Sequence, residues 1–119
     1  MISLLLMLAI DTSAPIRTMP ASAFGSTLDM RINRDPAGGL PPGGCMELVV
    51  VLDGKGRMSE TRITRSSGHR QIDRGVMLAL GTYPFNMADL QEGTPWRVFF
   101  SWSKDGRETR LSNKCVDLG

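Results

Sequence analysis

The fold is decided by residues 46–65, which read MELVVVLDGKGRMSETRITR. Apolar side chains alternate through 46–52, and β-branched residues fill most positions between them. This half therefore predicts a strand that is buried on one face and partly buried on the other. Asp53 and Gly54 predict a tight turn, since glycine readily takes the positive φ angles that a hairpin needs. Residues 58–65 alternate β-forming with charged residues, which predicts a second strand with one solvated face.

The residues that follow predict one helix and one or two further strands. Apolar side chains recur three and four positions apart through 70–80, which indicates an amphipathic helix. Gly81 is expected to end this helix, and Pro84 prevents its resumption. Alternation returns at 96–102 as a third strand, and a turn after it predicts a short fourth strand at 108–112. We therefore expect an α+β fold, with a small antiparallel sheet of three to four strands and one main helix packed on one face.

Residues 1–23 fit the pattern of a secretory signal peptide. The apolar run at 2–10 is too short to span a bilayer, which needs about 20 residues, but it suits the apolar part of a signal. The sequence ASA at 21–23 predicts cleavage after Ala23 and export. A cut after Ala14 is disfavoured by the proline that follows. The run also fits a buried strand or a start assigned too early.

Residues 24–44 are predicted to be a linker. Prolines and two Gly-Gly pairs interrupt regular structure over most of this segment. Apolar residues alternate with charged ones at 28–32, so a short strand is an open alternative there. The remaining residues, 45–119, are expected to form a single domain.

The chain has two cysteines, Cys45 and Cys115, which bracket the periodic region. In an oxidising compartment such a pair is expected to form a disulfide. Closing a loop of that length would stabilise the fold by roughly 4 kcal/mol in the chain-entropy model. The alternative is two free thiols, one at each end of the domain.

Four segments, taken in order, carry a family resemblance. They are VVVLDGKG at 49–56, ITRSSGHRQID at 63–73, YPF at 83–85 and VFF at 98–100. This arrangement resembles the C-terminal domain of the TonB family of energy transducers, over roughly half of the chain. The most specific part is the SSGH…ID block that follows a DGKG hairpin.

The resemblance implies a peptide-binding edge on the third strand. In that family, an extended peptide of an outer-membrane receptor pairs with the sheet there, which requires free backbone N–H and C=O groups. The corresponding residues here are Trp96, Arg97, Val98, Phe99, Phe100, Ser101 and Trp102. The alternative for the apolar members is a place in the core. A fourth strand at 108–112 would cover this edge.

The function that the resemblance implies is an exported peptide-binding domain, in the periplasm or cell envelope, that assists transport across the outer membrane. A separate inner-membrane subunit would then supply the membrane-spanning helix, because the apolar run is too short to do so. The alternative is a stand-alone periplasmic structural or interaction protein, which shares the fold and has no energy-coupling role.

The sequence predicts no catalysis and no cofactor or metal site. Ser66, Ser67 and His69 lie close together, but no G-x-S-x-G nucleophile elbow is present. His69 is the only histidine, and two distant cysteines do not complete a zinc site with it. The turn at 54–56 is too short for a phosphate-cradling loop.

The charge of the chain does not indicate a nucleic-acid partner. The net charge is only +2, from 14 basic and 12 acidic side chains. Arginines of the second strand and the helix start are expected on solvent faces, where they keep the domain soluble or contact an acidic peptide or an anionic glycan. They are Arg57, Arg62, Arg65, Arg70 and Arg74.

Overall fold

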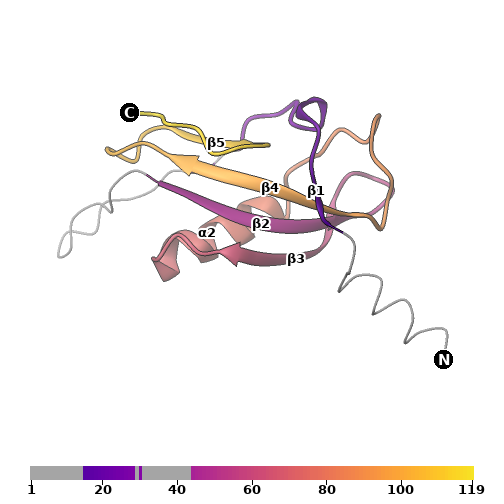
Figure 1. Ribbon diagram of the computed structural model, residues 1–119, viewed down its shortest axis with the longest axis horizontal. Coiled ribbons are helices and arrows are strands. Elements are labelled where there is room, and N and C mark those ends of the chain that lie inside the picture. The colour runs from indigo at the N-terminus through magenta and orange to yellow at the C-terminus, as the bar shows by residue number, and fades with distance from the viewer. Residues whose placement is uncertain (1–14, 29, 31–43) are drawn as a thin grey trace.

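The computed structural model describes residues 15–28, 30 and 44–119, which form an α+β fold (Figure 1). Its elements are β1 (Arg17–Thr18), the 3-10 turn η1 (Ala21–Ala23), β2 (Gly44–Leu52), β3 (Met58–Arg65), α2 (Arg70–Leu80), β4 (Pro95–Trp102) and β5 (Thr109–Ser112). The helix and the four longer strands agree with the predicted ranges within one or two residues. Within these residues, no helix has the length and apolar character needed to cross a membrane.

The sheet has five strands and is mixed. Its order is β1-β4-β2-β3, and β5 pairs with β4 beside β1. β2 lies between β3 and β4 and is antiparallel to both. β1 runs parallel to β4, so the expectation of a purely antiparallel sheet with three to four strands is wrong. The extra strand is β1, whose two residues are too few to show an alternating pattern in the sequence.

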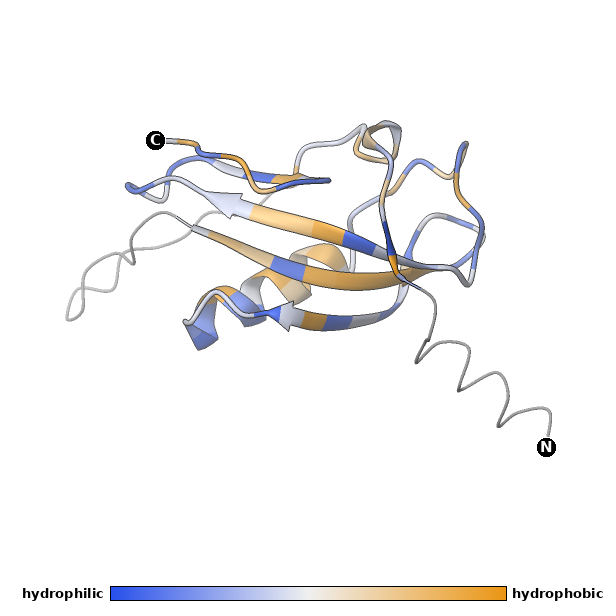
Figure 2. Ribbon diagram, in the orientation of Figure 1, coloured by the Kyte–Doolittle hydropathy of each residue, from blue (hydrophilic) through white to orange (hydrophobic). Residues whose placement is uncertain are grey.

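One face of the sheet packs on α2. The helix buries Ile72, Val76 and Leu80, and β2 and β4 contribute fully buried side chains that include Leu48 and Phe100. Figure 2 shows the corresponding apolar colouring along β2, β4 and the inner side of α2. Each such side chain contributes about 1.5–3 kcal/mol when buried. The apolar side chains that alternate in the sequence therefore form a core between two layers, the sheet and α2.

The N-terminal segment from residue 15 to residue 28 belongs to this core. Met19 and Ala23 are 0 % exposed. The Met19 N–H donates to the Arg97 carbonyl (3.0 Å), and the Tyr83 hydroxyl donates to the Ser26 carbonyl (2.6 Å). These contacts place residues 15–28 inside the folded unit, whereas the sequence predicted a leader up to residue 23 and a linker after it.

Parts of the predicted leader and linker lie outside the described residues. They are 1–14, which include the apolar run, together with Asp29 and 31–43. The short strand considered at 28–32 is described only at two positions, Leu28, which is buried, and Met30, which is partly buried. Neither position belongs to a strand.

Gly56, rather than Gly54, supplies the positive φ angle of the β2–β3 turn. The φ angle is 80° at Gly56, and Asp53 accepts hydrogen bonds from the N–H groups of Lys55 (2.8 Å) and Arg57 (3.0 Å). These N–H groups hold the pKa of the Asp53 carboxyl below its usual range. A Cβ atom on Gly56 would overlap the Phe85 carbonyl oxygen.

We expect Gly56→Ala to lower the free energy of unfolding by about 2–3 kcal/mol, because it adds backbone strain to that overlap. Gly54→Ala is the matched control in the same turn, since the nearest atom to its Cβ would be Glu92 Oε2 at 3.4 Å. The control should change the free energy by less than about 0.5 kcal/mol. Urea denaturation compares the two variants, and equal midpoints would contradict the role of Gly56.

Candidate functional site

The predicted peptide edge on β4 is paired on both sides. β2 pairs with β4 along its whole length. On the other side, β1 pairs with Trp96 and Arg97, and β5 pairs with Phe99 to Trp102. The structure therefore leaves no free run of backbone at 96–102, because the N-terminal segment and the C-terminal strand share this edge.

The side chains of β4 divide between the two faces of the sheet. Trp96, Val98, Phe100 and Trp102 are buried in the core. Arg97, Phe99 and Ser101 lie on the opposite face, and the first two of these are partly exposed. The structure therefore supports the alternative interpretation, in which the apolar residues of β4 belong to the core.

β5 and the residues that follow it, which cover the edge of β4, are held to the sheet by several contacts. Leu111 of β5 is 6 % exposed within the core. The Val116 N–H donates to Ser101 Oγ (3.0 Å). A disulfide joins Cys45 of β2 to Cys115, with 5.7 Å between their Cα atoms. The predicted disulfide is thus confirmed, and it holds the chain just after β5 against β2.

The long free edge of the sheet is β3 instead. This strand has eight residues and pairs with β2 on one side. Among the described residues, no strand pairs with its other side. Most of its residues are exposed, as the charged alternation of 58–65 implies for an edge strand. The alternation is therefore the sequence feature that indicates an edge strand at β3, whereas the family resemblance predicted the binding edge at β4.

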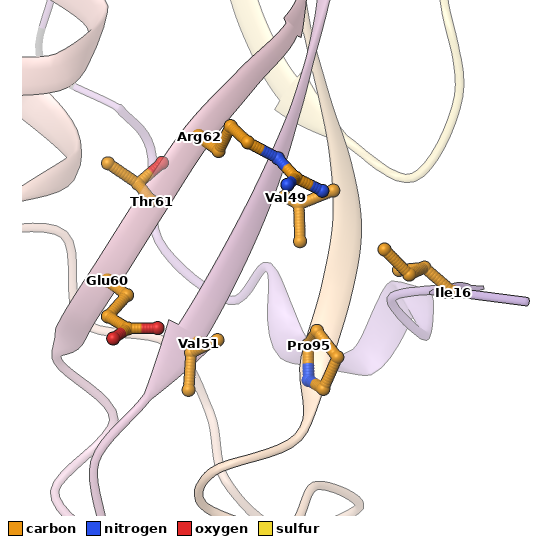
Figure 3. Close-up of a pocket in the computed structure, with 7 residues that line it drawn as sticks. All are labelled: Ile16, Val49, Val51, Glu60, Thr61, Arg62 and Pro95. Carbon is orange, nitrogen blue, oxygen red and sulfur yellow. The ribbon is translucent and has the colours of Figure 1, made fainter. Parts of the chain in front are cut away.

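A groove lies next to β3 on the sheet face opposite α2. It has a volume of about 390 Å³ and an apolar floor of Val49, Val51 and Pro95, bordered by Glu60 and Arg62 of β3. Figure 3 shows the apolar side chains rising from neighbouring strands, with Arg62 reaching toward Val49. A side chain from a segment that docks on β3 has room to enter here.

Ser66, Ser67 and Asp73 connect the end of β3 to the start of α2. Asp73 accepts hydrogen bonds from Ser66 Oγ (2.5 Å), Ser67 Oγ (2.6 Å) and the Ser67 N–H (3.0 Å). His69 is the N-cap residue, but it makes no side-chain cap bond. Gly68 reverses the chain with a φ angle of 87°. In this cluster, which links β3 to α2, the serines donate to a carboxylate, whereas the serine of a catalytic triad donates to a histidine.

We expect Asp73→Asn to lower the free energy of unfolding by about 1–2 kcal/mol at pH 7, because a neutral amide accepts these bonds less strongly. Burial alone would raise the pKa of Asp73, but the bonds from Ser66 and Ser67 outweigh it and lower the pKa below 3.8. The stabilisation is therefore present above pH 3.8 and is lost as the pH falls through the lower, folded-state pKa.

Urea denaturation at neutral and acidic pH measures this effect. Asp117→Asn is the control, since that exposed carboxylate accepts a local bond from the Gly119 N–H. A difference between wild type and Asp73→Asn that stays constant into strong acid would contradict the assignment.

The only ion pair among the described residues joins Arg97 to Glu47, with 3.2 Å between Nε and Oε1. Glu47 Oε1 also accepts a hydrogen bond from Thr64 Oγ1 (2.9 Å). These contacts link β4, β2 and β3 on the sheet face opposite α2, which we call the open face. With the residues that the structure describes, the arginines around β3 make no such ion pair.

In the described part of the chain, no three His, Cys, Asp or Glu side chains are grouped so that they could hold a metal ion. Comparison of the chain with protein-family models, with curated proteins and with solved structures gave no match.

Proposed function

We propose that this chain is an exported domain of the TonB C-terminal type that binds an extended peptide of an outer-membrane receptor, or of another envelope protein, by strand addition. The observation that carries the proposal is the eight-residue β3, which within the described residues is paired on one side alone. Strand addition gives such an edge a full set of new backbone hydrogen bonds. In this function the domain assists transport across the outer membrane.

The edge of β3 is a better site than the edge of β4. A peptide at β4 must displace β5, which has the buried Leu111 and is held by the disulfide at Cys115. Among the described residues, a peptide at β3 displaces no strand. In this proposal residues 96–102 form an interior strand of the sheet, and the peptide pairs with β3.

The Cys45–Cys115 disulfide supports the envelope as the location, since disulfides form and persist in oxidising compartments such as the periplasm. A separate inner-membrane subunit is the partner that would couple such a domain to a motor. The sequence resemblance supports that role, and the peptide experiment below is independent of it.

The proposal is tested by titrating synthetic peptides from N-terminal segments of outer-membrane receptors into ¹⁵N-labelled protein. We expect backbone amide shifts along Met58–Arg65 and small shifts along Pro95–Trp102. Peptides with proline at alternate positions are the control, because they cannot donate to the edge.

Two results would contradict the proposal as stated. Shifts concentrated on β4 would show that β5 is displaced and that the edge at 96–102 is the site. No shifts at about 1 mM peptide, a concentration that detects even weak binding, would favour the stand-alone structural protein.

A further inference from the structure

The free edge of β3 lies in a basic part of the chain. Residues 57–74 contain five arginines and two carboxylates, whereas the net charge of the whole chain is +2. We call the five arginines the basic edge. They are Arg57, Arg62, Arg65, Arg70 and Arg74, and all five are exposed. The residues around β3 therefore carry a local excess of positive charge.

Within the part of the chain that the structure describes, no carboxylate neutralises the basic edge. Among the described residues, no carboxylate lies within ion-pair distance of any of the five. One of the two local carboxylates, Asp73, is occupied by Ser66 and Ser67. The other, Glu60, borders the groove. Arg57 donates to a backbone carbonyl, that of Thr82, at 3.4 Å.

The arginines flank both sides of the position that an added strand would take. Side chains of such a strand alternate between the two faces of the sheet. On the open face they would meet Arg62, which borders the groove, and Arg65, whose Nη2 lies 2.9 Å from Cys115 Sγ.

On the other face they would meet the start of α2. Asp73 bonds to Ser66 and Ser67, which directly follow β3, so the side of α2 that carries Asp73 lies next to the end of this strand. Arg70 lies three residues before Asp73 and shares that side of the helix. Figure 2 shows hydrophilic colouring on both β3 and the first turn of α2.

We propose that the segment that adds to β3 is an acidic extended peptide, with Asp or Glu at several positions. This inference rests on the proposed function and names the chemistry of its partner. Carboxylates on either face of the added strand pair with exposed arginines, which suit carboxylates because they donate in a planar fork. The contacts are exposed, so salt weakens them.

The experiment uses two synthetic peptides as long as β3, one alternating Glu with Thr and the other alternating Gln with Thr. Fluorescence anisotropy measures their affinity for the full chain. We expect the Glu peptide to bind about tenfold more tightly at about 50 mM salt, and the difference to shrink markedly at about 500 mM.

The matched variants are Arg62→Gln/Arg65→Gln and Arg107→Gln/Arg110→Gln. Both pairs remove two exposed positive charges, but the second pair lies at β5 and the turn before it, with β4 and β2 between it and β3. We expect the first pair to weaken binding of the Glu peptide about fivefold or more, and the second pair less than about twofold.

Equal affinity for both peptides, with amide shifts on β3, would overturn the acidic partner and leave strand addition standing. An equal loss from both variant pairs would overturn it also, since the attraction would then be a general effect of net charge. No binding of either peptide at about 1 mM would overturn the inference and the proposed function together.

Discussion

A chain that begins at Phe24 is expected to lose about 5 kcal/mol of folding free energy relative to the full chain. The cut removes β1 and two core residues, Met19 and Ala23, both 0 % exposed. Burial of the methionine contributes about 1.5–3 kcal/mol, and each lost hydrogen bond about 0.5–1.5 kcal/mol. Such a loss approaches the whole stability of a small domain, about 5–15 kcal/mol. Urea denaturation of the two chains measures it.

A point variant separates this effect from a general effect of truncation. Met19→Ala should cost about 2–4 kcal/mol, because it leaves a cavity beneath the sheet. Thr18→Ala, at the exposed neighbouring position in β1, should cost less than about 0.5 kcal/mol. If the chain from Phe24 is as stable as the full chain, residues 15–23 do not belong to the core, and cleavage after Ala23 fits the fold.

Replacing both cysteines is expected to lower the free energy of unfolding by about 4 kcal/mol, since the disulfide closes a loop with a sequence separation of 70. Cys45→Ser/Cys115→Ser should also loosen β5, which the disulfide holds near β2. The measurement is urea denaturation of the wild type and the double variant, each with and without dithiothreitol.

Dithiothreitol should destabilise the wild type by the same amount and leave the double variant unchanged. A double variant within about 1 kcal/mol of the oxidised wild type would contradict a structural role for the disulfide. Increased hydrogen exchange at Phe99–Trp102 in the variant would show that β5 opens when the tether is lost.

The sheet and helix were predictable because their residues repeat with the period of the element. Val50 and its alternating neighbours could only serve a strand, and Ile72, Val76 and Leu80 could only serve one side of a helix. The cysteines were paired correctly because they flank the periodic region. The periodic patterns are local, and the two cysteines flank the periodic region. A single sequence is therefore enough to show both signals.

The neighbours of β4 were not predictable in the same way. β1 has two residues in a segment with prolines, and its pairing with Trp96 and Arg97 depends on tertiary contacts such as the burial of Met19. The strand at 108–112 was expected, but whether it covers β4 depended on the direction of the turn at Gly106, whose φ angle is 71°. Because β1 and β5 both pair with β4, the free edge of the sheet is at β3. The alternation of charged residues in β3 had predicted a strand with a solvated face.

Hydrogen exchange at the amides of β3 tests strand addition at this edge most directly. In the described part of the chain β3 pairs with β2 alone, so about half of its N–H groups point away from β2 and are expected to exchange rapidly. A saturating acidic peptide should slow these outward amides by at least about tenfold and leave the amides of β4 unchanged. Saturation without protection on β3, or protection that appears on Phe99–Trp102 instead, would contradict binding at the β3 edge.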